Sequence, residues 1–335
     1  SAAMSKFLPK LMPALSLRAN WLLLSSSSAV CESPPVPTVA KLPVVGAPEL
    51  VEIAGESRTA VGLPVDSSLA VELSETDGER LHFSLGANAP SWRLSNGATF
   101  RVRGTDRAGG QVERTWAAEE LAPDRWRSIE VDLAGLGAGR RVVFSLESGP
   151  ATGPCTLALG EVRSHGSRAQ SPTVLLITSD THRGDHLGFR ADDLDLDTPT
   201  LDGLAARGLS FTRALSSSPN TLPSHSALMT GRHPLELGML SNYDRLDDRF
   251  ATLAERFAAA GYLTLGAASS RNLDHRGSGL GRGFDRYSTP DGGLERPAAA
   301  TLETLTGWLD ELGDAPVFVW LHFFDAHQPY TPPED

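Results

Sequence analysis

The chain has 335 residues, of which 40% are hydrophobic and 21% are charged, so its composition is that of a globular protein with about two or three domains. No apolar run approaches the roughly 20 residues that cross a bilayer, which excludes an integral channel or transporter. The net charge of −11, from 30 basic and 41 acidic residues, argues against nucleic acid as the main partner. Two cysteines, Cys31 and Cys155, are too few for a disulfide framework or a thiolate zinc site.

Residues 1–43 have the pattern of an export leader followed by a linker. Basic residues precede a short apolar run at 21–24, and small residues then lead to Cys31. This order is that of a secretory signal, and a cysteine at its end suits lipid attachment. The alternatives are plain export without an anchor and a leader with no targeting role. We expect an exported protein, in the periplasm or cell envelope or secreted, with a proline-rich linker at 33–37.

Residues 44–166 alternate apolar and polar side chains over short segments separated by turn signals. The strand-like segments are 69–73, 81–85, 99–103, 128–133 and 142–146. Asp77-Gly78 and Asn96-Gly97 are among the turn signals between them. Several short strands at this spacing predict an all-β module, either a sandwich or a jelly roll. Its three tryptophans admit two interpretations, a platform that stacks on sugar rings or ordinary core packing: Trp92, Trp116 and Trp126.

Residues 171–335 alternate strands with helices, which predicts a doubly wound α/β domain with a mainly parallel sheet. Strands are expected at 174–180, 262–267 and 317–322, where continuous apolar runs suit burial on both faces. The expected helices are 201–207, a helix that opens near Pro223, 250–260 and 302–312. The predicted boundary between the two domains lies near 166–170.

Polar clusters follow three of these elements, where a doubly wound sheet places its ligands. They occupy residues 180–185, 220–225 and 322–327. Asp180 ends a buried strand, and its carboxylate is a hard oxygen ligand for a divalent cation. A lone histidine is usually structural, and we expect His322 to serve in packing.

Taken together, four segments resemble the sulfatase family of the alkaline phosphatase superfamily. They read Val-Leu-Leu-Ile-Thr-Ser-Asp (174–180), Thr-Pro-Thr-Leu-Asp-Gly-Leu-Ala-Ala-Arg-Gly (198–208), Thr-Leu-Pro-Ser-His-Ser-Ala-Leu-Met-Thr-Gly-Arg (221–232) and His-Phe-Phe-Asp-Ala-His-Gln-Pro-Tyr (322–330). The resemblance covers the N-terminal part of that family's domain, so we expect the chain to be a fragment that lacks downstream ligands and is inactive alone. It implies hydrolysis of a sulfate or phosphate ester, with a glycan as one candidate substrate.

The resemblance also implies roles for individual residues. Thr221 takes the place of the family's nucleophile at a helix N-terminus, where free N–H groups favour a bound sulfate or phosphate. Asp180 and Thr221 would contact one divalent metal ion, Ca or Mg by the resemblance, with Mn or Zn as alternatives. His225 and His327 would hold substrate oxygens or protonate the leaving group. Arg232 is a candidate substrate ligand whose alternative role is a salt bridge at the helix end.

The sequence departs from the family pattern at four points. The family carries Cys or Ser, converted to formylglycine, where this chain has Thr221, so formylglycine is not expected here. His225 replaces the supporting arginine, and no lysine follows Gly261-Tyr262-Leu263-Thr264. The family has a pair of aspartates after the first strand, whereas this chain has Asp180 followed by Thr181. Asp185 is an uncertain substitute for the second aspartate. The alternatives are therefore a phosphodiesterase or phosphoglycerol-transferase type of enzyme and a non-catalytic glycan-binding envelope protein.

The mechanistic reading makes a geometric prediction. One cation that touches both oxygens places the Asp180 carboxylate within roughly 5 Å of the Thr221 hydroxyl, and a separation above about 8 Å would exclude it. His327 should lie on the same rim of the sheet. Thr221 should open a helix that runs through about Met229, with Pro223 in its first turn, where a missing N–H costs little.

Overall fold

The computed structural model describes residues 22–23, 48–53, 56–73, 78–120, 125–165, 172–190, 196–291, 293–312 and 315–330. The expected anchor at Cys31 and the expected boundary at 166–170 lie outside these ranges. Of residues 1–43 only β1 (Leu22–Leu23) is described, and it pairs in parallel with β12 (Leu209–Ser210). Within the described ranges, no helix combines the length and the apolar character that a membrane span requires.

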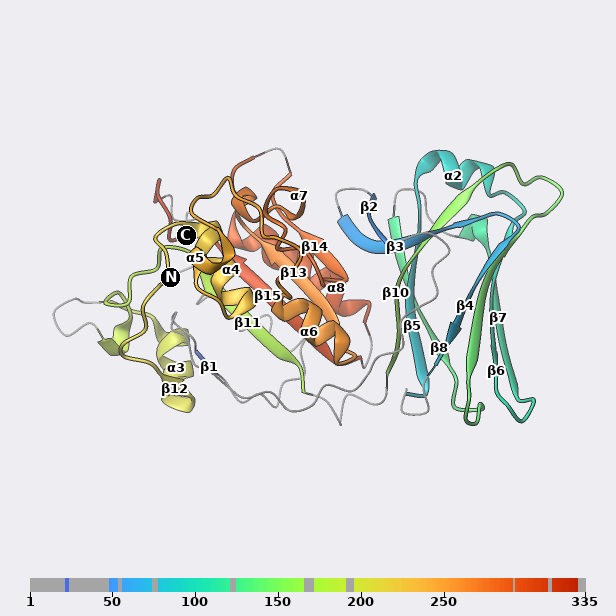
Figure 1. The fold of residues 1–335 in the computed structure, drawn as a ribbon, viewed down its shortest axis with the longest axis horizontal. Coiled ribbons are helices and arrows are strands. Elements are labelled where there is room, and N and C mark those ends of the chain that lie inside the picture. Colours follow the sequence, from blue (N-terminus) through green and yellow to red (C-terminus); the bar gives the residue numbers. More distant parts are fainter. Residues whose placement is uncertain are drawn as a thin grey trace.

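Two sheets face each other in the N-terminal part of the chain (Figure 1). One sheet has the order β4-β9-β6-β7: β4 (Ser67–Glu72), β9 (Arg141–Glu147), β6 (Thr99–Thr105) and β7 (Gln111–Ala117). The facing strands are antiparallel: β2 (Glu49–Ile53), β3 (Glu56–Pro64), β5 (Arg80–Ala87), β8 (Arg125–Asp132) and β10 (Thr156–His165). A short helix, α2 (Ala89–Leu94), and a 3-10 turn (Ala118–Glu120) complete this part.

Aromatic rings fill the space between the two sheets. Phe83 of β5 meets Phe144 of β9 edge-on at 5.3 Å, and both side chains are fully buried. Trp116 packs edge-on against Phe83 at 6.1 Å, and Trp92 packs against the same core. Trp126 is 4% exposed. The three tryptophans therefore serve in packing, which is the second of the two interpretations given above.

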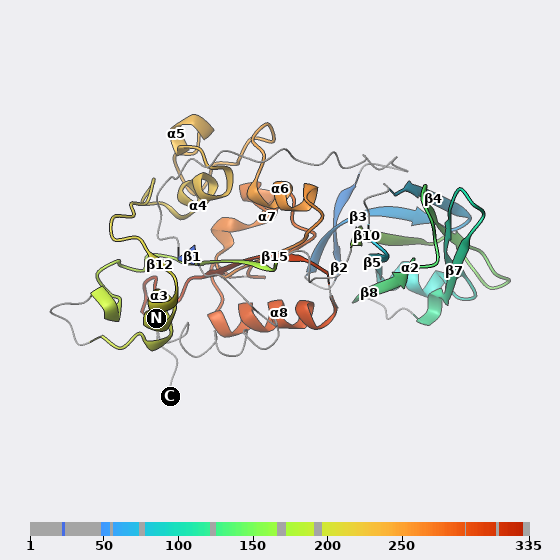
Figure 2. The same cartoon turned by 90° about the horizontal axis from the view of Figure 1, so that it is seen from below.

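The C-terminal part is a parallel sheet covered by helices on both faces (Figure 2). Its strands are β11 (Val174–Ser179), β15 (Val317–Phe323), β13 (Leu263–Ala268) and β14 (Arg286–Ser288), in that order across the sheet. One face packs against α3 (Pro199–Arg207) and α8 (Ala298–Asp310), and the other against α4 (Thr221–Thr230) and α6 (Leu253–Ala259). Short elements complete it: α5 (Pro234–Leu237), α7 (His275–Ser278) and 3-10 turns at Gly188–Arg190 and Arg271–Leu273.

Successive side chains of β15 alternate between the two faces of the sheet, so this strand contributes to the core on each side. Val317 and Val319 point to the α8 side, whereas Phe318 and Trp320 point to the α6 side, and all four are fully buried. The β11, β13 and β15 pairings are all parallel, as the continuous apolar runs predict.

The two parts share one sheet, which the sequence does not predict. β14 pairs antiparallel with β3, with Arg286 opposite Arg58, so the parallel strands continue into β10, β5 and β8. β14 has only three residues and no apolar run, so its sequence gives no strand signal. The sheet is accordingly mixed: it is parallel from β11 to β14 and antiparallel from β14 to β8.

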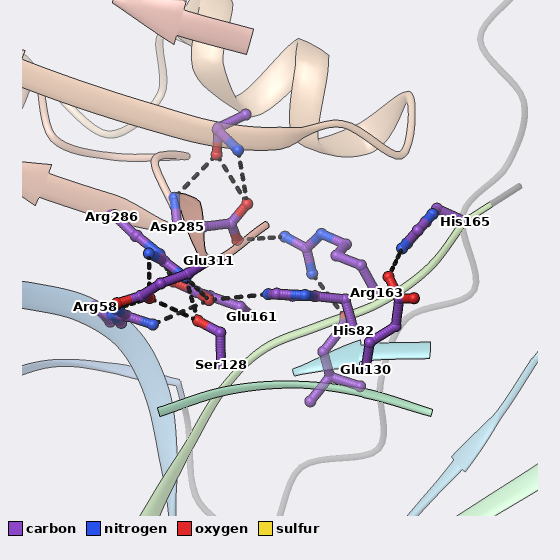
Figure 3. Close-up of polar contacts among 12 residues, drawn as sticks. Arg58, His82, Ser128, Glu130, Glu161, Arg163, His165, Asp285, Arg286 and Glu311 are labelled. Carbon is purple, nitrogen blue, oxygen red and sulfur yellow. Dashed lines mark hydrogen bonds and ion pairs between the residues drawn. The ribbon is translucent and has the colours of Figure 1, made fainter. Parts of the chain in front are cut away.

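A buried network of charged side chains lies where β14 pairs with β3 (Figure 3). The Glu161 carboxylate accepts hydrogen bonds from Arg286 Nε at 2.8 Å and from Arg58 Nη1 at 3.2 Å, and His82 Nε2 lies 3.3 Å away. The side chains of Glu161, Arg58 and Arg286 are all fully buried. Because an unpaired charge is costly in such an environment, each member of the network depends on the others.

Candidate active site

Asp180 is positioned by the neighbouring strand β15. β11 ends at Ser179, and the Asp180 N–H donates to the Phe323 carbonyl at 2.9 Å. The parallel register sets Thr178 opposite His322, so the side chains after β11 and those at the end of β15 lie at one edge of the sheet. This edge is the carboxyl end of the strands, where doubly wound sheets bind ligands.

Thr221 is the first residue of α4, and Asn220 precedes it in an extended conformation. Pro223 occupies the first turn, as the sequence predicts, and the helix ends at Gly231, whose φ of 68° is left-handed. The Leu222 N–H in this turn donates to Asn242 Oδ1 at 2.9 Å. The expected helix from Thr221 through about Met229 is therefore present, one residue longer than expected.

Three side chains converge beside Thr221. Asp180, His225 and His322 each present a ligand atom, and these atoms lie within 4.8 Å of one another. His322 Nε2 is 3.3 Å from Asp180 Oδ2, and all three residues are buried. The Thr221 side chain also lies near enough to the Asp180 carboxylate to lower its pKa. These four residues come from β11, α4 and β15, and we call them the Asp180 cluster.

Hydrogen bonds fix the orientation of the His225 ring. Its Nδ1–H donates to the Thr221 carbonyl at 2.8 Å, because a carbonyl can only accept. Nε2 is therefore unprotonated in the neutral ring and accepts from the Thr178 hydroxyl at 3.3 Å. That hydroxyl in turn accepts from Trp320 Nε1 at 3.2 Å. This chain of contacts fixes the ring, with Nε2 as its unprotonated nitrogen.

The charges in the cluster follow from burial and from its internal contacts. Burial, together with the neighbouring His322, lowers the pKa of His225 to about 4, so the ring is neutral near pH 7. Burial alone would raise the pKa of Asp180, but hydrogen bonds from His322 and Thr221 keep it below its usual value. The cluster thus presents one carboxylate beside a neutral imidazole.

The donor set fits a divalent metal ion. One carboxylate oxygen and two imidazole nitrogens, all buried and mutually close, are ligands that Zn²⁺ and Mn²⁺ accept readily. Ca²⁺ prefers six to eight oxygen ligands. His322, which we expected to serve in packing, belongs to this set. The signal that could have identified it is its position as the one ionisable residue in an otherwise apolar strand.

The other candidate residues lie outside the Asp180 cluster. His327 is on the loop after β15, stacked on Phe324 at 4.2 Å, so it lies at the same edge of the sheet without joining the cluster. Arg232 follows α4 at the end opposite Thr221 and pairs with Glu236 at 3.6 Å. This contact is the helix-end salt bridge considered above as the alternative.

Asp185, the uncertain substitute for the family's second aspartate, is also elsewhere. Its side chain is 59% exposed and pairs with Arg183 at 2.7 Å. It also lies 2.9 Å from His186 Nδ1. Its carboxylate is therefore occupied by neighbours on its own loop.

Comparisons with known proteins assign the C-terminal part of the chain to one family model. Residues 172–335 match the family model described as Sulfatase. An arylsulfatase of Klebsiella aerogenes is 27% identical over 225 residues, which cover 51% of this chain and 46% of the relative. An ulvan-active sulfatase of Formosa agariphila is 39% identical over 93 residues, 28% of this chain and 18% of the relative.

A solved structure with a similar fold is that of a phosphonate monoester hydrolase of Agrobacterium radiobacter. It has a TM-score of 0.39 and 24% identity, and the match covers 49% of this chain and 42% of that one. The chain therefore spans less than half the length of each of these relatives.

Proposed function

Because residues 172–335 belong to the sulfatase family, we propose that they form part of a metal-dependent hydrolase of sulfate or phosphate esters in which Thr221 is the nucleophile. The observation that carries this proposal is the position of Thr221 at the first turn of α4, where its side chain helps to lower the pKa of Asp180, a member of a three-residue metal-ligand set. A hydroxyl is a weak nucleophile at its free pKa and needs an activating neighbour.

In this mechanism Asp180, His225 and His322 would hold the metal ion. When bound, the ion would lower the pKa of the Thr221 hydroxyl and offset negative charge on the transferred group. Thr221 Oγ loses its proton to solvent as it attacks sulfur or phosphorus, the bond to the leaving oxygen breaks, and the group remains on Thr221 until water displaces it and restores the hydroxyl. His327, on the loop at the same edge, is the candidate that protonates the leaving oxygen.

His225 has a different role from the arginine that it replaces. With a pKa of about 4 it is neutral at physiological pH, so it neither attracts the ester by charge nor supplies a proton. Its Nδ1–H instead ties the ring to the first turn of α4, so Nε2 is the nitrogen that would bind a metal ion, in place of its contact with the Thr178 hydroxyl. No lysine occurs after Lys41 either. These features favour an ester with a single negative charge: a sulfate monoester, a phosphate diester or a phosphonate monoester.

Turnover of an ester panel tests the proposal. The full-length protein is assayed with 4-nitrophenyl sulfate, bis(4-nitrophenyl) phosphate, a phosphonate monoester and 4-nitrophenyl phosphate, each with Mg²⁺, Ca²⁺, Mn²⁺ or Zn²⁺. Thr221→Ala should reduce turnover by more than about a thousandfold, and Thr221→Ser should retain part of it. Thr230→Ala at the other end of α4 is the matched control, since the Thr230 hydroxyl donates to the Ser226 carbonyl at 2.7 Å and accepts from the Arg232 N–H at 3.3 Å, both away from Thr221. Full turnover by Thr221→Ala would contradict the assignment.

We further propose that the protein is exported and lipid-anchored at Cys31. The support is the order of basic, apolar and small residues before that cysteine. Fractionation of cells that express the parent or Cys31→Ser tests it. The parent should partition with membranes and the variant should be released; identical partitioning would contradict the anchor.

A further inference from the structure

A hollow lined by arginines lies beside the candidate active site. Its volume is about 590 Å³, and its lining includes Arg183, Arg190 and Arg213, with Asp185 as the only acidic residue. The whole chain carries a net charge of −11, so three guanidinium groups around one depression are a local reversal of the overall charge. Leu215, 79% exposed, adds an apolar surface to the rim.

The arginines retain hydrogen-bond donors for a ligand. Arg183 pairs with Asp185 through its Nε and Nη2 atoms, at 3.0 and 2.7 Å, so this charge is balanced. Within the part of the chain that the structure describes, Arg190 donates only from Nη2 to the Thr212 carbonyl at 3.1 Å, and this neutral acceptor leaves its charge unbalanced. Arg213 is exposed on the same lining. Two positive charges therefore remain, and a guanidinium fork matches sulfate or carboxylate oxygens.

Contacts between loops place the hollow next to the Asp180 cluster. Arg183 follows Asp180 by three residues, and between them the Thr181 hydroxyl donates to the Ala326 carbonyl at 3.1 Å. Ala326 belongs to the loop that carries His327. The segment that carries Arg183 and the loop that carries His327 are therefore in contact through this hydrogen bond.

We propose that the hollow binds a second anionic group, a sulfate or carboxylate that is not cleaved, on a glycan whose ester is held at Thr221. The inference rests on the proposed function, because it assigns the hollow to the same substrate. It names the substrate class: a glycan with more than one anionic group, rather than a singly charged aryl ester. Arg190 and Arg213 are the residues that recognise the second anion.

Binding without turnover tests this assignment. Isothermal titration is done on full-length Thr221→Ala loaded with Zn²⁺, using a disulfated disaccharide, its monosulfated form and a monosulfated disaccharide with a uronate carboxylate. The second anion should tighten binding by about tenfold over the monosulfated form. Arg190→Ala with Arg213→Ala should abolish that difference, and higher salt should reduce it. Arg207→Ala, an exposed arginine of α3 outside the hollow lining, is the control and should keep it.

The carboxylate and disulfated arms identify which anion the hollow prefers. Equal affinity for singly and doubly charged disaccharides in the parent would overturn the proposal, as would a difference that survives both arginine substitutions. The titration needs no catalysis, so it tests anion binding separately from the proposed reaction. If the protein cleaves no ester but still binds the second anion through Arg190 and Arg213, the proposed reaction is contradicted and the anion-binding role of the hollow stands.

Discussion

Replacement of Glu161 by glutamine tests whether the buried network holds the two parts of the molecule together. The substitution keeps the size of the side chain and removes the negative charge that faces Arg58 and Arg286, whose side chains are fully buried. After the substitution both arginines would still pair with the half-exposed carboxylate of Glu311, which lies 3.5 Å from Arg58 and 2.9 Å from Arg286. Removal of one partner from a buried pair costs about 3–5 kcal/mol of unfolding free energy. Each kcal/mol lowers the melting temperature by roughly 2–4 °C, so we expect a fall of at least about 6 °C.

Urea and thermal unfolding of the parent and Glu161→Gln measure this cost. Glu147→Gln is the control, because Glu147 is 48% exposed and pairs with Arg101 at 2.9 Å on the surface, where a pair contributes less than about 1 kcal/mol. Burial opposes ionisation of Glu161, but Arg286 and Arg58 outweigh it and lower its pKa. The stabilisation should therefore be complete above the ordinary Glu pKa near 4.3 and fade as the pH falls below it. A variant within about 1 kcal/mol of the parent at pH 7 would refute the reasoning.

Three further predictions concern the Asp180 cluster. Asp180→Asn or His322→Ala should weaken Zn²⁺ binding by more than about tenfold in competition with a zinc indicator, and unchanged affinity would remove that residue from the ligand set. In metal-free protein the lowered pKa of His225, about 4 against 6.5 when unfolded, means that the unfolded chain gains its proton first as the pH falls. The unfolding free energy should drop by about 3 kcal/mol between pH 7 and pH 4, and urea titrations of His225→Gln should show a smaller drop. Thr178→Val should leave Trp320 Nε1 unpaired and cost about 1–3 kcal/mol by the same titration, whereas no loss would mean that the hydroxyl is dispensable.

The elements that depend on local periodicity can be predicted from the sequence. The apolar runs of β11 and β15 have one interpretation, a strand covered on both faces, and the two strands pair in parallel. α4 begins at Thr221 because Pro223 favours a first turn, and it ends where Gly231 adopts a positive φ. Asp180 lies at the carboxyl edge of β11, and α4, which packs on this sheet, brings its first turns to the same edge.

The features that depend on long-range contacts cannot be predicted in this way. The β3–β14 pairing joins segments more than 220 residues apart, and the opposite residues Arg58 and Arg286 are polar, so no hydrophobic pattern marks it. His322 looks like a packing residue along β15, and only the register with β11 places it beside Asp180. The neutrality of His225 also follows from tertiary burial, because its neighbours in sequence carry no charge.

The central claim is that Thr221 becomes covalently linked to the group that it removes from the ester. Full-length protein with its metal is mixed with a substrate that it turns over, quenched in acid within one turnover, digested and analysed by mass spectrometry. The account predicts that the peptide containing Thr221 gains the mass of one sulfo or phospho group, that fragmentation places the group on the threonine, and that Thr221→Ala shows none. Turnover with an unmodified Thr221 peptide at every quench time, or with the group on another residue, would contradict it.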